Sequence, residues 1–486
     1  MVGTLYKDSW LWEVQLGRFL IPVYQMVLGY SVAPAVSTIL SLGILSLTVL
    51  VLTRLLDFQG RILRYLAGML VLASPLVQSL LSYYYCSVAY SCSFLLAVLA
   101  AVLFTRADKT QGKAQWKDIA LGALLLCLSA GGYQSYLAVV VTLCLIALIF
   151  RVIHGDSARA LRKQFVRCLA GGAAGVACYL IVNKCVTHVV GTQNTSARGF
   201  STMGKIDWAG LPSRLYLYGH FYKEYFWGTE LVNNDYGIVP RRYLNLIFIL
   251  VAAAIVLHYL ILGNGRFLRR LVAFLMMVLI PAATLSLFLF APQISILETT
   301  GSLMTPAFSL SYLFVLALFE KTVNRPAVPV RWIVQVLAAL ILLMLCHMAL
   351  DGQSFVRYDA HQKVTLVRNL ASELPACMKD AHTDKVVLVG YPEKGYYDDR
   401  YAHLRDSVHW IVQSYGVIWP DFEGRQVSYE RLCEDYAGFH YQVVGADKVK
   451  DLLSDPVIDR MPCYPEEGSI QQVGGVLVVK LSEENP

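Results

Sequence analysis

The segment APAVSTILSLGILSLTVLVLTRL, residues 33–55, carries a single charged side chain, Arg54, close to its end. A helix needs about 20 mainly apolar residues to cross the hydrocarbon core of a bilayer. The segment therefore predicts a membrane-spanning helix. Similar apolar segments follow it at 62–82, 87–105, 118–134, 136–152, 168–190, 244–262, 269–290, 304–320 and 331–350. Together they predict an α-helical polytopic membrane protein with about ten spans.

Composition supports this reading and divides the chain. Of its 486 residues, 56% are hydrophobic and 15% are charged, whereas soluble domains carry about 25% charged residues. The shortage of charged residues ends near Asp351. We therefore expect a first external loop with an interfacial helix at 1–32, a multi-span membrane domain at 33–350 and a soluble domain at 351–486. The net charge of +7 does not indicate nucleic-acid binding, because the chain shows no basic helix or aromatic platform of the usual kinds.

The last segment has the pattern of a small α/β domain. Its expected helices are 362–379 and 402–414, and its expected strands are 385–390 (KVVLVG), 441–445 and 475–481. It contains no GxGxxG, P-loop or GxSxG motif. Nothing in this domain requires catalysis.

Short basic loops alternate with loops poor in basic residues along the membrane region. The basic loops follow the first, third, fifth, seventh and ninth predicted spans, and cytoplasmic loops are the ones enriched in Lys and Arg. The opposite side then receives residues 1–32, the C-terminal domain and the remaining loops. The basic residues are Arg54, Arg61, Arg64, Arg106, Lys109, Lys113, Lys117, Arg151, Arg159, Arg162, Lys163, Arg167, Arg266, Arg269, Arg270, Lys321, Arg325 and Arg331.

This topology starts the first span outside the cell, although the sequence shows no signal peptide before it. An upstream helix would carry residues 1–32 across the membrane. We therefore expect the sequence to begin inside its first external loop.

The external segment WLWEVQLGRFLIPVYQMVLG, residues 10–29, contains the candidate anion-binding residue Arg18. A guanidinium grips a phosphate with two parallel hydrogen bonds. The alternative is an interfacial amphipathic helix in which Arg18 extends toward water. Both interpretations are open at the level of sequence.

A second polar segment, SAGGYQSYLAVV, residues 129–140, joins two predicted spans. Tyr133 and Gln134 are candidate substrate contacts. The alternative is a packing turn, with glycines allowing close approach and Gln134 hydrogen-bonded inside the bundle. Acidic residues of the external loops, Asp235 and Glu298 among them, are further candidates. The long external loop at 191–243 is rich in Trp and Tyr, which indicates an interfacial belt or a sugar platform.

Cysteines show no CxxC pair and no Cys/His spacing typical of a metal site. We therefore expect no metal. Three cysteines, Cys377, Cys433 and Cys463, lie in the predicted external domain. Because that compartment favours oxidation, we expect two of the three to be bridged.

Three motifs in order, LGRFLIPVYQMVLG at 16–29, ASPLVQSLLSYYY at 73–85 and LSAGGYQSYLAVV at 128–140, resemble those of the type-two Gtr glucosyltransferases of bacterial membranes. The resemblance covers most of residues 9–350 in layout. It implies a GT-C-like bundle with its active site in external loops. The implied donor is a polyprenyl-phosphate sugar, usually glucose, and the implied acceptor is an O-antigen or related surface glycan; no other cofactor is implied.

The resemblance also implies a carboxylate base in the first external loop, where Asp8 and Glu13 are the available candidates. The family's acidic motif in that loop precedes the GRF segment and is not in this sequence. A second departure is YYYCSVAY, residues 83–90, where an acidic residue is expected near Ala89. Rival interpretations are a lipid-linked glycan polymerase or ligase, and a transporter or flippase of lipid-linked sugars. A transporter typically shows internal repeats and broken helices, and no repeat is visible.

Overall fold

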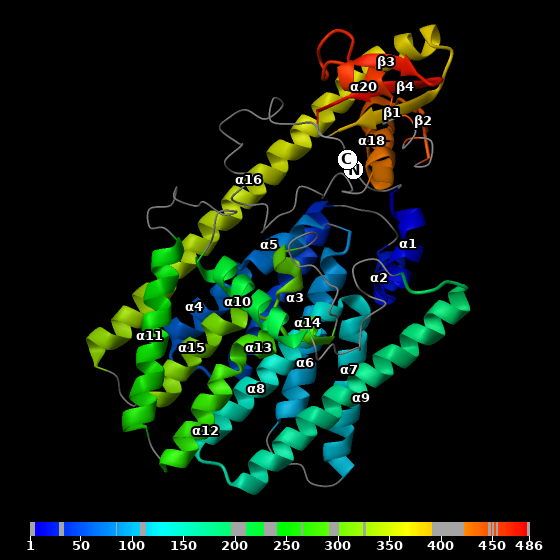
Figure 1. Ribbon diagram of the computed structural model, residues 1–486. Helices are drawn as coiled ribbons and strands as arrows, with labels where there is room; N and C mark the ends of the chain where they lie inside the picture. Colours follow the sequence, from blue (N-terminus) through cyan, green and yellow to red (C-terminus); the bar gives the residue numbers. More distant parts are fainter. Residues whose placement is uncertain are drawn as a thin grey trace. The chain divides into compact units, whose positions relative to one another are not determined.

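The computed structural model (Figure 1) divides into two compact units, Val2–Leu350 and Asp351–Pro486. The first unit is built of helices, and the second combines helices with a small sheet. The structure describes residues 5–28, 34–83, 85–106, 113–195, 210–227, 241–263, 266–290, 301–323, 327–390, 422–445, 449, 452 and 455–483.

Seven helices among the described residues are long and apolar enough to cross a membrane. An eighth candidate is a bent pair, α4 (Arg61–Leu72) with α5 (Pro75–Ser82). The chain therefore fits a polytopic helical membrane protein. The seven are α3 (Pro34–Leu55), α6 (Ser87–Thr105), α8 (Leu137–His154) with η1 (Gln134–Tyr136), α9 (Ala158–Val190), α11 (Arg241–Leu262), α12 (Phe267–Val278) with α13 (Ile280–Thr284), and α16 (Val328–Asp380).

The break between α4 and α5 follows from the Ser-Pro pair. Ser74 is extended (φ −66°, ψ 152°) and Pro75 is the first residue of α5. Proline lacks an N–H and disfavours a helical residue before it, so the helix stops and restarts at an angle of 40°. The sequence predicted one continuous span at 62–82, and the structure places two helices there.

Ten spans remain a prediction from the sequence. Helices α7 (Lys113–Gly132) and α15 (Ser309–Thr322) occupy two of the predicted ranges without meeting the criteria for a candidate span. The 14 residues of α15 cover only about 21 Å at 1.5 Å per residue, and the hydrocarbon core is about 30 Å thick. The other helices of this unit are α1 (Leu5–Gln15), α2 (Leu20–Val27), α10 (Leu211–Trp227), α14 (Ser286–Phe290) and η3 (Gly301–Met304).

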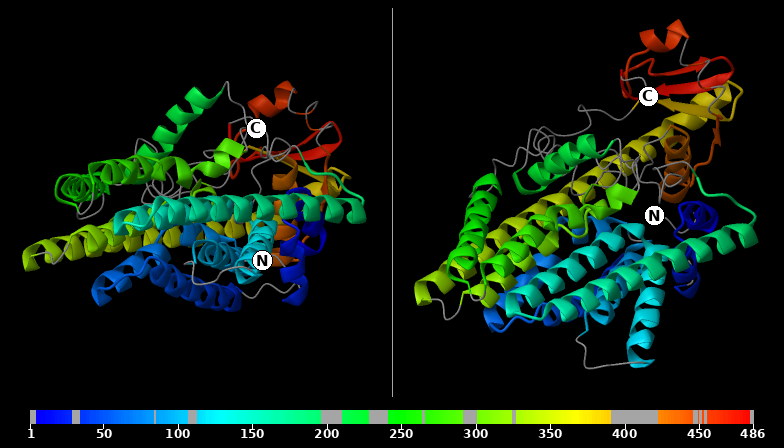
Figure 2. Two further views of the ribbon diagram at one scale, coloured as in Figure 1. Left: turned by 90° about the horizontal axis from the view of Figure 1, so that it is seen from below. Right: turned by 60° about the horizontal axis from the view of Figure 1, so that its bottom comes forward.

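Helix α6 packs against α3, α7 and α8, and α7 packs in turn against α9. Figures 1 and 2 show α9 running across one face of the helical unit beside α7. The ring of Phe104 covers Gly122 of α7 and Gly171 of α9, where an added Cβ would collide with it. Small residues thus let three helices approach closely.

Charged loops predicted to be cytoplasmic meet one another in pairs. Lys321, in the last turn of α15, lies 3.2 Å from the carboxylate of Asp57, after α3. Arg167, on α9, lies 3.1 Å from Asp118 on α7 and donates to the carbonyl of Arg106, which follows α6. These contacts therefore join the loop after α3 to the last turn of α15, and the loop after α6 to α9.

The C-terminal unit contains a four-stranded sheet in the order β2-β1-β4-β3. Strand β1 (Lys385–Val389) runs parallel to β2 (Gln442–Val443) and to β4 (Val476–Lys480), while β3 (Ile470–Val473) forms a hairpin with β4. The predicted strands at 385–390, 441–445 and 475–481 overlap β1, β2 and β4. The helix predicted at 402–414 lies outside the described residues.

Both faces of this sheet are covered, which explains the continuous apolar run of β1. Val386 and Leu388 pack against α16 and α18 (Phe422–Ala437). Val387 and Val389 pack on the other side against residues that include Ile458 of α20 (Pro456–Arg460).

All eleven cysteines are free thiols. The expected bridge between two of Cys377, Cys433 and Cys463 is therefore not formed. Cys433 is buried within the core of α16, α18 and the sheet, whereas the Cys463 thiol faces Glu483 at 3.7 Å. Packing thus holds the two thiols in different surroundings.

Candidate functional site

A tight turn between α1 and α2 presents the first candidate residues. Gly17 adopts the left-handed conformation (φ 73°) and donates to the carbonyl of Val14, while the Arg18 N–H donates to the carbonyl of Glu13 at 2.8 Å. This pair of hydrogen bonds is the Schellman ending of a helix, which favours glycine at this position. The turn brings the Arg18 and Glu13 side chains to the same place.

Arg18 is buried in this site, with 8% of its surface exposed. Its Nη1 lies 3.3 Å from a carboxylate oxygen of Glu13 and 3.2 Å from the hydroxyl of Tyr90 on α6. Its guanidinium also sits 4.9 Å from the centre of the Tyr133 ring. The alternative in which Arg18 extends to water is therefore wrong for this structure.

Gln134 fixes the α1–α2 turn from the opposite side. Its Nε2 donates to the carbonyl of Leu16 at 2.8 Å and to the hydroxyl of Tyr179 at 2.9 Å. The Tyr179 hydroxyl donates in turn to the carbonyl of Gly17 at 3.2 Å. Gln134 thus acts in packing, as the structural interpretation of the GGYQSY motif predicted.

The glycines of the same motif allow this approach. An added Cβ at Gly131 would collide with the ring of Phe19, and one at Gly132 would overlap the hydroxyl of Ser93 on α6. The sequence GGYQ therefore combines two close contacts with two polar side chains. It sets Tyr133 beneath the guanidinium of Arg18.

Two further segments reach this site. The Tyr133 hydroxyl contacts the sulfur of Met304 in η3 at 2.9 Å. Gln15 donates to the side chain of Thr192 at 3.0 Å, and its carbonyl accepts from the N–H of Thr195. The α1–α2 turn, the GGYQSY turn and the segment at 192–195 were all predicted to be external, whereas Tyr90, Tyr179 and Met304 come from predicted spans.

Several buried polar atoms in or near the site have no hydrogen-bond partner among the described residues. They include Nε of Arg18, the hydroxyl of Tyr136 and both amide atoms of Gln25. Leaving such a group unsatisfied costs about 1–3 kcal/mol. Nε of Arg18 is therefore a buried donor without a hydrogen bond to the described residues.

Of the predicted site residues, the structure brings together Glu13, Arg18, Tyr133 and Gln134. Asp8 belongs to α1, but its side chain is outside the described part of the structure. Asp235 and Glu298 also lie outside the described residues.

Sequence reasoning missed Tyr90 and Tyr179. Tyr90 lies 72 positions from its partner Arg18 in the sequence, and no local sequence pattern predicts that contact. It follows directly after Ala89, the position near which the resemblance implied an acidic residue. In this structure the phenol of Tyr90 and the carboxylate of Glu13 both contact the guanidinium of Arg18.

Two aromatic residues near the end of α10 are packed inside the helical unit. Tyr225 and Phe226 are buried, at 3% and 7% exposure, and their rings lie 4.9 Å from Phe308 and 5.4 Å from Tyr312. By contrast, Tyr216 is 82% exposed. The belt and the platform predicted for this loop therefore do not apply to Tyr225 and Phe226, which form core.

Fold and site together fit a polytopic helical membrane protein with a buried Arg–Glu pair surrounded by tyrosines. The family model described as glucosyl transferase GtrII matches residues 6–318. The chain belongs to this glucosyltransferase family, which confirms the resemblance drawn from its motifs. A search of curated proteins and a search of solved structures returned no match. The GT-C-like architecture thus stays a prediction.

Proposed function

We propose that this protein transfers glucose from a polyprenyl-phosphate donor to a cell-surface glycan at the outer side of the membrane. Family membership gives the glucosyl transfer. The donor rests on one observation, the buried guanidinium of Arg18 with its unpaired Nε. A guanidinium that keeps a free donor in a membrane protein is suited to the phosphate of a lipid.

The reaction that fits this site is displacement at the anomeric carbon. The bond between that carbon and the donor's phosphate oxygen breaks, and a bond to the acceptor hydroxyl oxygen forms. Negative charge develops on the departing polyprenyl phosphate, and Arg18 is placed to stabilise it. The acceptor proton passes to a carboxylate, for which Asp8 is the proposed base.

Glu13 was a candidate base at the level of sequence, but we propose a different role for it. Its carboxylate is buried at 2% exposure and is already paired with Arg18 at 3.3 Å. It therefore holds the guanidinium in place through Nη1, while Nε forms no hydrogen bond with the described residues. Tyr133 is proposed to contact the donor, and Gln134 to position the turn. Asp235 and Glu298 are proposed sugar contacts on the evidence of their loops alone.

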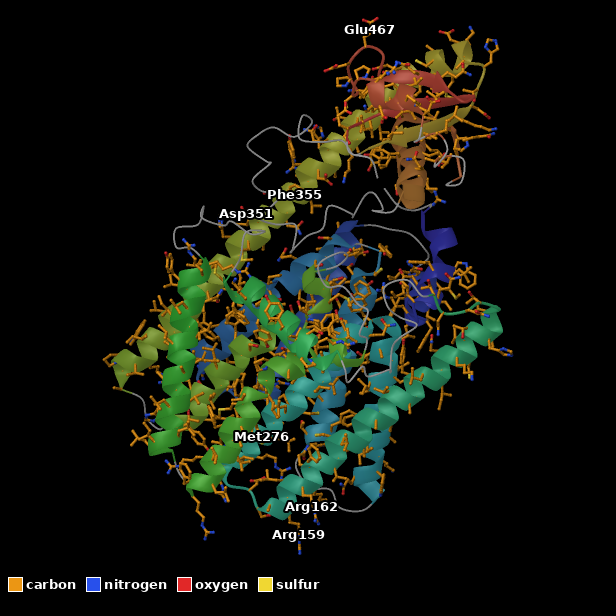
Figure 3. All side chains as sticks on the ribbon, in the orientation of Figure 1. Arg159, Arg162, Met276, Asp351, Phe355 and Glu467 are labelled. Atoms are coloured by element: carbon orange, nitrogen blue, oxygen red, sulfur yellow. The ribbon has the colours of Figure 1, made fainter. Side chains whose placement is uncertain are left out.

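The side of the membrane is proposed from charge distribution. Contacts between Asp57 and Lys321 and between Arg106 and Arg167 join loops rich in Lys and Arg, which favours a cytoplasmic position for that end. Figure 3 shows Arg159, at the start of α9, pointing away from the helical unit. The turn that carries Arg18 and the GGYQSY turn belong instead to segments predicted to be external.

Donor turnover in membranes tests the proposal. Radiolabelled polyprenyl-phosphate glucose is supplied to membranes that contain equal amounts of wild-type protein, Arg18→Lys or Arg159→Lys, and glucose in the glycan is counted. Removing one donor to a developing oxyanion costs about 10²–10³-fold in rate, so we expect Arg18→Lys to lose about 10²-fold. The exposed Arg159 makes the matched control, and its substitution should leave transfer unchanged.

Different results would support the rival functions. Equal transfer by Arg18→Lys and wild type would remove the phosphate role. Movement of the labelled lipid across the bilayer without release of polyprenyl phosphate would indicate a flippase. Joined glycan repeats among the products would indicate a polymerase or ligase.

A further inference from the structure

A group of three potential metal ligands lies in the C-terminal unit. Glu430 and Glu434 are one turn apart on α18, and His440 follows shortly after the helix ends. Gly438 takes the left-handed conformation (φ 63°) and its N–H donates to the carbonyl of Glu434. The chain reverses there and returns the imidazole Nδ1 of His440 to the carboxylate of Glu430.

The ligand atoms of these three side chains lie within 4.8 Å of one another. In a tetrahedral zinc site with bonds of about 2.0–2.1 Å, ligand atoms are about 3.3 Å apart. The difference is about 1.5 Å at most, which a change of side-chain rotamer covers. Glu434 and His440 are exposed and free to make it.

Glu430 supplies an observation separate from this spacing. It is 8% exposed, and the ion-pair partner of its Oε1 is the imidazole Nδ1 of His440. The hydroxyl of Tyr441, the next residue after His440, is also buried without a hydrogen-bond partner among the described residues. A buried carboxylate is costly unless a cation or a donor satisfies it.

We propose that Glu430, Glu434 and His440 form a binding site for a divalent transition metal ion, with zinc as the best match. An imidazole nitrogen with carboxylate oxygens suits zinc, whereas magnesium and calcium prefer oxygen ligands only. Three protein ligands leave a fourth position for water or another ligand. This site is independent of the proposed glucosyl transfer, because all its residues follow the part of the chain that matches the family.

The test uses the full-length protein, purified in detergent through an affinity tag without histidines. Zinc is titrated in competition with a chromophoric chelator. The wild type should take up one zinc ion per chain, and zinc should raise its unfolding temperature. His440→Asn should weaken binding at least about tenfold, since even groups that only support metal ligands are worth 10–100-fold.

His382→Asn is the matched control. His382 is exposed in the same unit, with its Nδ1 3.0 Å from the carbonyl of Asp380, and it is outside the cluster. Its substitution should leave zinc affinity unchanged. Glu434→Gln, a change of nearly equal volume, should weaken binding as His440→Asn does and so separates lost ligation from misfolding.

Two results would overturn the proposal. One is a wild type that binds no zinc, in which case Glu430 and His440 form an ion pair only. The other is equal zinc affinity in His440→Asn and His382→Asn. Either result leaves the glucosyl-transfer proposal untouched, because that proposal is measured by donor turnover.

Discussion

Substituting Gly132 by alanine tests how the site is positioned. An added Cβ would overlap the hydroxyl of Ser93 on α6 and lie 3.1 Å from the Ser93 Cβ. The next residue, Tyr133, carries the ring 4.9 Å from the guanidinium of Arg18. Any movement of α7 away from α6 therefore moves this ring as well.

The expected magnitude follows from the overlap. Extra carbon in a packed interior costs about 1–3 kcal/mol, and displacing reacting groups by about 1 Å can cost about 10²-fold in rate. Gly132→Ala should therefore lower both the unfolding temperature and donor turnover. Adding Ser93→Ala removes the overlapping hydroxyl and should restore much of both. The Ser93 hydroxyl donates only to the carbonyl of Ala89 in its own helix, so Ser93→Ala alone should be mild.

The assay compares the four members of this cycle at equal protein levels in membranes, with thermal unfolding measured in detergent. Gly43→Ala in α3 is the control, because nothing lies within 4 Å of the added Cβ; it should be neutral or slightly stabilising. Normal turnover and stability in Gly132→Ala, or no rescue by Ser93→Ala, would refute the packing argument.

Three further predictions concern other parts of the molecule. Glu13→Ala leaves the buried Arg18 unpaired and should destabilise the protein by about 3–5 kcal/mol in thermal unfolding; a cost below about 1 kcal/mol would contradict the ion pair. Burial, with the nearby Glu13 carboxylate, raises the pKa of the Cys86 thiol well above its usual value. Because this protonated thiol is also buried, it should resist a water-soluble maleimide at pH 8, whereas the less buried Cys463 should react. The pKa of Cys86 is higher in the folded protein than in the unfolded chain, so its protonated thiol contributes fully to folding stability below about pH 9, and this contribution is lost at higher pH. Labelling of Cys86 at the rate of an unfolded control would contradict its burial. Alkaline phosphatase fused at Ala360 should be active if the C-terminal domain is external, whereas activity of a cytoplasmic reporter there would reverse the topology.

Long apolar segments made most of the helices predictable. Every predicted span overlaps a helix, because about 20 apolar residues have few alternatives to a buried helix. The hydropathy pattern did not show where an apolar segment is divided into separate helices. Ser74 and Pro75 split one predicted span into two helices at an angle, and α15 is shorter than its apolar segment. Hydropathy is insensitive to such interruptions.

The site was predictable where it depends on local chemistry. Gly17 before Arg18 marks a helix ending, and that ending places Arg18 beside Glu13. Gln134, close after the Gly131-Gly132 pair, indicated a buried hydrogen bond. The contact of Tyr90 with Arg18 depends instead on how α6 packs, which no single segment encodes.

In the C-terminal unit, too, some features were predictable from the sequence and others were not. The apolar strands β1 and β4 were predicted, whereas β3, with the sequence IQQV, was missed because its polar residues do not form an apolar run. Glu430 and Glu434 are recognisable as a pair one helical turn apart, but His440 joins them only through the chain reversal at Gly438. A metal site of this kind is invisible to cysteine and histidine spacing.

Arg18 is proposed to bind the phosphate of a lipid-linked sugar. Its most direct test is the binding of polyprenyl phosphate and of polyprenol, the same lipid without phosphate, to purified protein in lipid nanodiscs. The wild type should prefer the phosphate, and Arg18→Ala should bind both lipids with the same low affinity, with Arg159→Ala behaving as wild type. An undiminished preference for the phosphate in Arg18→Ala would contradict the claim.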